Sequence, residues 1–347
     1  MKKKLLLVIL VMAVLITASC SLTGGGGKET YKTIKSSVSD LTVEVPASWI
    51  ETKVNADASV EVTDAKKGYS FVIIEEPADD FVDGFTVDDY TALVQGIVMQ
   101  YMGVNEAPPL NDVVICDGIN AKQYEISGSV EAVKVRSYAV VTKVNGFFYQ
   151  FLGSSLEKSY DDAKTIFKTI IDSTDFGAAV IIDEPVAQSA KSDEGEAAAP
   201  AVQVIKSKKS SLTLEFPADW TEGFELDNVT IEMDNLANDS YALVVEENAS
   251  DFKDGFTLDD YTGIIVEIMM ENLGSTETPE ITDIVVGDGV QAKQFIVSGE
   301  DGNFKLTYLD TCVKANDIFY NIQMYTISSK FEKAKPVFDE IIKSAAF

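Results

Sequence analysis

The sequence predicts an α+β protein with two tandem copies of one domain, each an antiparallel sheet flanked by helices. The first half superposes on the second without a gap when it is shifted by 171 residues. Residues 41–49 (LTVEVPASW) match residues 212–220 (LTLEFPADW), and residues 80–91 match residues 251–262 at ten of twelve positions. Matching at constant spacing over roughly 140 residues indicates duplication of a whole domain. Successive strands joined by short turns predict antiparallel pairing within each copy.

The predicted domain boundaries follow changes in composition. A glycine run follows the N-terminal segment, and a stretch rich in Ala, Glu and Pro separates the copies; both compositions are typical of segments without a packed core. The predicted organisation is a signal peptide over residues 1–19, a flexible tether over 20–30, a first domain over 31–176, a linker over 177–202 and a second domain over 203–347.

The N-terminal segment has the pattern of an export signal. Three lysines precede an apolar run over residues 5–16, and small residues follow as far as Cys20. An uncleaved anchor is the alternative, but twelve apolar residues are short for a helix that crosses roughly 30 Å of hydrocarbon. Residues 17–20 (TASC) resemble the bacterial lipoprotein box. The resemblance implies a lipoprotein with diacylglycerol and palmitate at Cys20, anchored at the extracytoplasmic face of the cell membrane.

Strands are expected on both sides of a mid-domain helix in the first copy. Asn145-Gly146 and Asp117-Gly118 are pairs that tolerate the positive φ angles of a type I′ hairpin turn, and the second copy has Asn316-Asp317 and Asp288-Gly289 in their places. The expected strands cover residues 41–45, 59–63, 69–75, 113–116, 120–127, 133–144 and 147–154.

The mid-domain helix is expected to begin after Thr86. This residue is a good N-cap, and Asp88 and Asp89 fall in the first turn, where carboxylates meet the positive end of the helix dipole. Gly103 stands where a left-handed residue would end the helix. The second copy repeats the pattern from Thr257 to Gly274.

A second amphipathic helix is expected to close each copy. Pro336 falls within the second version, so we expect either a kink there or a helix that begins at Pro336. The apolar stripes are Tyr160, Ala163, Ile166, Phe167, Ile170 and Ile171, and Phe331, Ala334, Val337, Phe338, Ile341 and Ile342.

Charge and composition exclude several functions. Without the three lysines of residues 1–19, the chain carries 25 Lys and Arg against 56 Asp and Glu, a formal charge of −31. Such an acidic protein is repelled by nucleic acid, and Arg136 is its only arginine. Histidine is absent, which removes Ser-His-Asp and Cys-His catalysis and His-containing zinc sites. We therefore expect no catalytic residue, no metal site and no cofactor.

Two cysteines remain besides Cys20. The repeat places Cys116 opposite Gly287 and Cys312 opposite Val141, so the two do not form an equivalent pair. Both lie in apolar runs, where a free cysteine packs as a small hydrophobe. A reactive thiol and an interdomain disulfide are the alternatives.

The doubled acidic segment is the candidate for specific chemistry. Its acids are Asp80, Asp83, Asp88 and Asp89, with Asp251, Asp254, Asp259 and Asp260. An EF-hand reading with Gly84 at position six fails, because Phe81 and Tyr90 stand where oxygen ligands are required. Turn formation and helix capping account for the same residues, and calcium binding is the alternative.

Several motifs together resemble the PsbP family. Each copy has a strand that ends in Pro-x-x-Trp (Trp49, Trp220), a Gly-x-x-Ala hairpin (Gly118, Gly289) and a closing helix with a central Phe. This family includes the extrinsic photosystem II protein, the Ran-binding Mog proteins and many small bacterial lipoproteins. The resemblance implies a PsbP-like α/β/α sandwich in both copies and no common active site. The two tryptophans are expected to be packing residues, with a ligand platform as the alternative.

These observations favour a membrane-anchored surface lipoprotein that acts as a noncatalytic interaction or ligand-binding module. Its expected partner is an envelope protein or a small ligand, and the two linked domains would raise the effective concentration of a second site. The alternatives are an acidic-residue hydrolase acting on envelope glycans, which needs two opposed carboxyl groups in a cleft, and a divalent-cation binder.

Overall fold

The computed structural model describes residues 30–177 and 201–347, except residues 56, 131–132, 224–225, 227 and 288. Cys20, the predicted signal peptide, residues 178–200 of the predicted linker and Asp288 therefore lie outside the described residues. The chain divides into two compact units, the first built mainly from residues 30–177 and the second mainly from residues 201–347. No helix in the described ranges is long and apolar enough to span a membrane.

The first unit contains one seven-stranded antiparallel sheet and a separate two-stranded hairpin. The sheet order is β3-β4-β5-β9-β8-β7-β6, and β1 pairs with β2. The strands are β1 (Tyr31–Lys35), β2 (Thr42–Pro46), β3 (Ile50–Glu51), β4 (Ala58–Asp64), β5 (Tyr69–Pro77), β6 (Asn111–Ile115), β7 (Ile119–Val130), β8 (Val133–Val144) and β9 (Phe147–Leu156). All seven predicted strands are confirmed, whereas β1 and β3 were not predicted because β1 is largely polar and β3 has two residues.

The second unit repeats this topology strand for strand. Its sheet order is β12-β13-β14-β18-β17-β16-β15, and β10 pairs with β11. The strands are β10 (Val202–Lys206), β11 (Thr213–Pro217), β12 (Thr221–Glu222), β13 (Val229–Asn235), β14 (Ser240–Asn248), β15 (Thr282–Val286), β16 (Val290–Asp301), β17 (Phe304–Ala315) and β18 (Ile318–Ile327).

Some of the hairpin turns have the conformation that their sequences predict. Asn145 and Gly146 both have positive φ (50° and 80°), as do Asn316 and Asp317 (52° and 58°), as the I′ prediction requires. The turn at Asp117-Gly118 differs, because Cys116–Gly118 form one turn of 3-10 helix.

Four α-helices complete the fold: α1 (Val87–Tyr101), α2 (Tyr160–Asp172), α3 (Leu258–Leu273) and α4 (Phe331–Lys343). The prediction that α4 begins at Pro336 is wrong. The helix starts five residues earlier, at Phe331, because the buried side chains of Phe331 and Phe338 hold both halves of one apolar stripe on the sheet.

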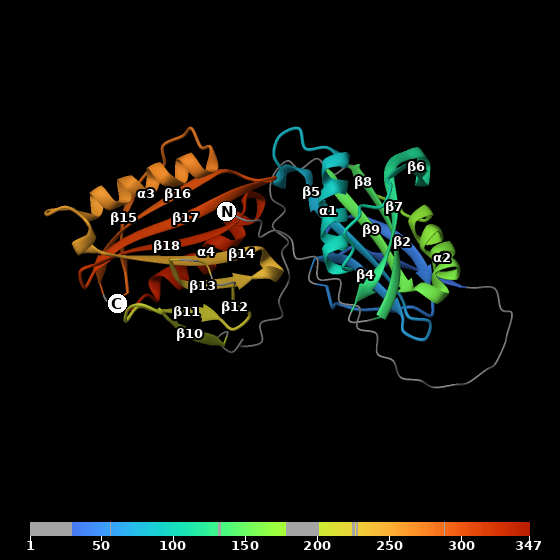
Figure 1. Cartoon of the computed structure of the whole chain (residues 1–347), viewed down its shortest axis with the longest axis horizontal. Coiled ribbons are helices and arrows are strands. Elements are labelled where there is room, and N and C mark those ends of the chain that lie inside the picture. Colours follow the sequence, from blue (N-terminus) through green and yellow to red (C-terminus); the bar gives the residue numbers. More distant parts are fainter. Residues whose placement is uncertain are drawn as a thin grey trace. The chain divides into compact units, whose positions relative to one another are not determined.

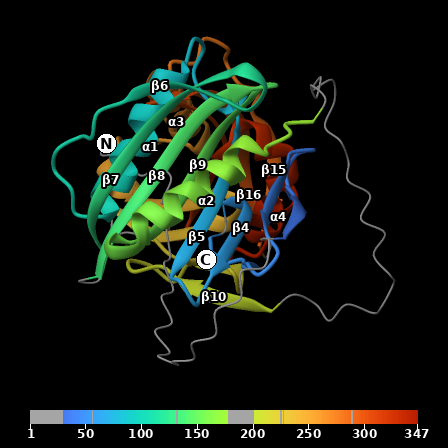
Figure 2. The same cartoon turned by 90° about the vertical axis from the view of Figure 1, so that its right-hand side faces the viewer.

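Each sheet is the middle layer of an α/β/α sandwich. In the first unit, α2 lies across one face (Figure 2), where Phe167 packs with Trp49 of the hairpin segment and with Phe71 and Phe151 of the sheet. Tyr90 of α1 stacks on Phe148 from the opposite face. In the second unit, Figure 1 shows α3 on one side of the sheet and the β10–β11 hairpin on the other.

Candidate functional site: a cavity in the second unit

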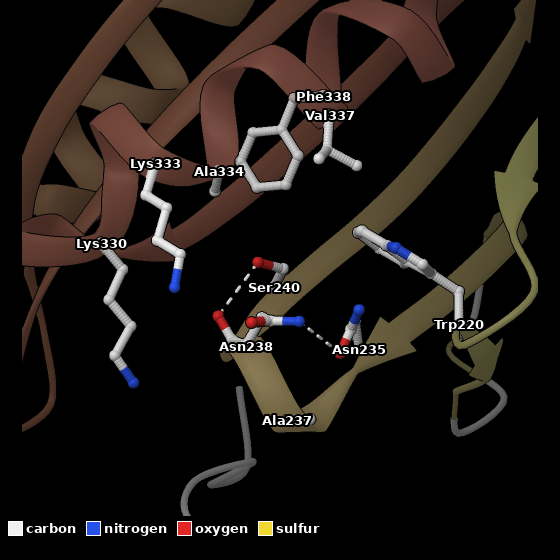
Figure 3. A pocket seen from close by; sticks show the side chains of 10 residues that line it. All are labelled: Trp220, Asn235, Ala237, Asn238, Ser240, Lys330, Lys333, Ala334, Val337 and Phe338. Carbon is white, nitrogen blue, oxygen red and sulfur yellow. Dashed lines mark hydrogen bonds between the residues drawn. The ribbon is translucent and has the colours of Figure 1, made fainter. Parts of the chain in front are cut away.

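A cavity of about 270 Å³ opens between α4 and the sheet of the second unit. Figure 3 shows it in close view, with α4 on one side and the turn between β13 and β14 on the other. Its ten lining residues are Trp220, Asn235, Ala237, Asn238, Ser240, Lys330, Lys333, Ala334, Val337 and Phe338.

The lining is apolar at one end and cationic at the other (Figure 3). Trp220, Phe338 and Val337 form the apolar end. The Trp220 ring is 3% exposed and meets the Phe338 ring edge to face, with 6.4 Å between their centroids. Lys330 and Lys333 extend from the start of α4 at the other end.

The polar wall between these ends is held by its own hydrogen bonds. The Asn238 side chain donates to Asn235 Oδ1 (3.2 Å), and the Asn235 side chain donates to Asp219 Oδ2 (2.9 Å). The Ser240 hydroxyl donates to the Asn238 carbonyl (3.1 Å). Because these groups are already oriented, the wall can meet a ligand without rearrangement.

The two lysines differ in their pairing. Lys330 forms an ion pair with Asp239, which follows Asn238 in the turn. Lys333 is exposed and has no ion pair among the described residues. None of the ten lining residues is acidic, so the cavity offers no carboxyl pair for acid–base chemistry.

Tyr69 occupies the equivalent place in the first unit, where the repeat aligns it with Ser240. Tyr69 is 5% exposed, and its ring centroid lies 6.4 Å from the rings of both Trp49 and Phe167. The first unit therefore has a buried ring at this position, where the second unit has the short side chain of Ser240 at the wall of the cavity.

A smaller cavity of about 210 Å³ lies in the first unit. Val114 on its rim is 65% exposed, and Lys168 reaches over the Tyr138 ring at 5.7 Å. Because this cavity is the smaller of the two, we regard the cavity beside Trp220 as the better candidate. The lining is Val113, Val114, Ile115, Tyr138, Lys168, Ile171 and Asp172.

The doubled acidic segment has a structural role at its two helix starts. Asp89 and Thr86 form a capping box at α1, and Asp260 and Thr257 form the same box at α3. The Thr86 hydroxyl and amide hold the pKa of the Asp89 carboxyl below its usual value.

The neighbouring acids pair with lysines. Asp88 lies 2.6 Å from Lys122 Nζ, and Asp259 lies 2.7 Å from Lys293 Nζ. Within the described ranges, no group of three or more Asp, Glu or Cys side chains is placed to hold a metal ion. Capping and ion pairing thus account for Asp88, Asp89, Asp259 and Asp260. Asp80 is buried instead, and burial raises the pKa of its carboxyl to about 6.

The tryptophans and the two cysteines noted in the sequence pack in the cores of the units. Trp49 is 1% exposed, so it is a packing residue, whereas Trp220 both packs and lines the cavity. Cys312 is a buried free cysteine, and burial raises its pKa far above the usual value. Cys116 packs against the core of the first unit. The sequence pattern missed Ser240, because it becomes visible only when the copies are aligned and Tyr69 is found opposite.

Comparison with solved structures finds similar folds. Cyanobacterial PsbP (CyanoP) from Synechocystis sp. PCC 6803 has 19% sequence identity and a TM-score of 0.34, with 46% of this chain and 98% of that chain covered. The Ran-binding protein Mog1p of Saccharomyces cerevisiae has 7% identity and a TM-score of 0.33 over 43% and 96%. LpqN of Mycobacterium tuberculosis, involved in cell envelope biogenesis, has 16% identity and a TM-score of 0.27 over 43% and 91%.

These neighbours are consistent with PsbP-like domains. No protein-family model matches the sequence, and no curated protein matches it.

Proposed function

We propose that this protein is a noncatalytic binding protein, held at the extracytoplasmic face of the cell membrane through Cys20, that takes a small ligand into the cavity beside Trp220. The observation that carries the proposal is the exchange of Tyr69 for Ser240 at equivalent positions. One copy of the domain has a buried ring at this position, and the other has a serine that lines a cavity of about 270 Å³ beside Trp220. Small-molecule sites have this combination of apolar walls and a few oriented polar groups.

A binding role suits the chemistry of the lining better than catalysis. The chain has no histidine, and the ten lining residues include neither a carboxyl group nor a cysteine. Lysine, asparagine and serine side chains remain, and these recognise a ligand through charge and hydrogen bonds. An acidic-residue hydrolase would need two opposed carboxyl groups, which this cavity does not contain.

Membrane attachment follows from the lipoprotein box at residues 17–20. A diacyl anchor gives stable attachment, and the glycine-rich tether leaves the two units clear of the membrane surface. Cys20→Ala is expected to move the protein from the membrane fraction to the soluble fraction and to abolish labelling by a clickable palmitate analogue. Retention of both in the variant would refute the anchor.

Ligand binding can be tested through Trp220 itself. In a Trp49→Phe variant that starts at Ser21, Trp220 is the one tryptophan left, so its fluorescence reports on the cavity wall. Fractions of a small-molecule extract of the cell envelope are expected to change its emission. Ser240→Tyr, which introduces the ring found in the first unit, should remove the response. An equal response from both proteins, or none from either, would contradict the proposal.

A further inference from the structure

We infer that the ligand of the Trp220 cavity is a small anion with one ring, whose carboxylate or phosphate group meets Lys333 and Lys330 while its ring lies against Trp220. This inference rests on the proposed function and adds the chemical class of the ligand. The observation that carries it is the separation of cationic and aromatic groups at opposite ends of one cavity (Figure 3).

The charge of the lining is the reverse of that of the chain. Acids outnumber bases by 56 to 28 in the sequence, yet the lining contains two lysines and no acid. Lys330 faces two acids, Asp239, with which it forms an ion pair, and Asp80, whereas Lys333 has no acidic partner in the described part of the chain. A cavity with this lining favours an anion over a neutral or cationic molecule.

The comparison with the first unit links the charge to the open space. Lys330 and Lys333 align with Ser159 and Asp162, so the unit that has Tyr69 also lacks both cations. Three differences therefore occur together at one place in the second unit: a ring is absent, a lysine replaces Asp162, and a second lysine replaces Ser159. The acid that pairs with this second lysine, Asp239, stands where the first unit has Gly68. Open space and positive charge together describe a site for an anion better than either does alone.

The position of α4 adds a charge of the same sign. The cavity lies against the first two turns of this thirteen-residue helix, where Lys333, Ala334 and Val337 line it. The positive end of the helix dipole therefore acts in the same direction as the two lysines.

The volume limits the ligand to about one ring. A cavity of roughly 150 Å³ with apolar walls accommodates benzene. About 270 Å³ therefore suffices for a six-membered ring with a charged substituent, and a longer polymer would have to leave most of its length outside. Val337, which is 40% exposed, and the accessible edge of Trp220 supply the apolar contact, with Phe338 buried behind them. The Asn238 and Ser240 side chains lie between the two ends.

The test compares matched charged and neutral probes in the Trp49→Phe protein. Benzoate and phenyl phosphate carry the charge, and benzamide is the neutral analogue of benzoate. The expected result is that benzoate binds at least about tenfold more tightly than benzamide, because charge-assisted hydrogen bonds are stronger than neutral ones. Added sodium chloride should weaken the binding of benzoate and leave that of benzamide almost unchanged.

Two lysine variants distinguish binding in the cavity from attraction by the general charge of the surface. Lys333→Gln is expected to remove most of the preference for benzoate. Lys335→Gln is the matched control, because Lys335 lies on the same helix but is paired with Asp339 at 2.8 Å and does not line the cavity. It should leave the preference intact, and equal losses in both variants would overturn the inference.

The outcomes distinguish the ligand class from the function itself. Equal affinity for benzoate and benzamide, or an envelope fraction that acts on Trp220 while no aryl anion binds, would refute the anion class and leave the proposed function standing. Unchanged benzoate binding in Ser240→Tyr would refute both, because the ligand would then lie elsewhere.

Discussion

The two units share one topology but place one aromatic ring on opposite faces of the sheet. Residues 69–70 are Tyr-Ser at the start of β5, and residues 240–241 are Ser-Tyr at the start of β14. Successive side chains of a strand point to opposite faces, so exchanging two neighbours moves a ring from one face to the other. A cavity can therefore open in a duplicated domain without any change in strand order or strand length.

In the second unit, the face of the sheet that receives the Tyr241 ring carries further aromatic rings. In the second unit, Tyr325 stacks between Tyr241 and Tyr308, with centroid distances of 5.0 and 4.5 Å across three neighbouring strands. The equivalent residues of the first unit are three serines, Ser70, Ser154 and Ser137. Ser137 and Ser154 share a hydrogen bond of 2.7 Å. The second unit thus has aromatic contacts on the α3 face where the first unit has small polar groups.

The largest expected effect on the unfolding free energy concerns a buried acid, Asp310, which has no acidic equivalent in the first unit. Asp310 is fully buried on the α3 face of the sheet, and Ala139 is its equivalent. Gln323 donates to its Oδ1 (2.9 Å), and its Oδ2 has no hydrogen-bond partner in the described part of the chain. Burial raises the pKa of Asp310 to about 7.

A raised carboxyl pKa means that the folded state binds a proton that the unfolded state has already lost. The second unit should therefore lose up to about 4 kcal/mol of unfolding free energy as the pH rises from about 4 to about 7. Asp310→Asn should remove this loss. Urea unfolding followed through Trp220 in Trp49→Phe measures it, and parallel pH profiles of the variant and the parent would show that Asp310 is not responsible.

The next largest effect on the unfolding free energy concerns the buried ring of Tyr69 in the first unit. Tyr69→Ser should lower the unfolding free energy of the first unit by about 3 kcal/mol, because it empties a space lined by Trp49 and Phe167. Trp49 fluorescence in a Trp220→Phe background reports on this unit. Ser240→Tyr is the converse change and should leave the second unit equally or more stable. A loss below about 1 kcal/mol for Tyr69→Ser would mean that the two units close this space in another way.

A smaller effect is expected from the tyrosine row. Tyr325→Ser removes the middle ring and both stacking contacts, which should cost the second unit about 2 kcal/mol. Tyr325→Phe keeps the ring and should cost much less. Equal losses in these two variants, measured by urea unfolding, would show that the hydroxyl and not the stacking stabilises the row.

The smallest effect is expected where the two units are alike. Thr86→Ala and Thr257→Ala each remove a capping box and should each cost about 1 kcal/mol. The two losses should agree within about 0.5 kcal/mol, because the caps have the same residues and geometry. A large difference, with each unit measured through its own tryptophan, would show that the helices contribute unequally to the two units.

Much of the fold was predictable because its signals are local. The capping residues Thr86 and Asp89 and the turn at Asn145-Gly146 each depend on neighbours within a few positions. The strands β1 and β10 were missed because they are short and their pairing partners decide them. The start of α4 was misjudged because Pro336 is tolerated within the helix when the buried residues on either side pack against the sheet.

The sequence by itself determined the duplication, the class of fold, the helix caps and the predicted lipid anchor, because these depend on repeats and short motifs. Only the tertiary structure showed that residues from the segment after β11, the turn before β14 and the start of α4 surround one cavity. Trp220, Ser240 and Lys333 are up to 113 residues apart in the chain. They meet because the sheet and the helix bring distant segments together, and the cavity lies where this copy has Ser240 and the other copy has Tyr69.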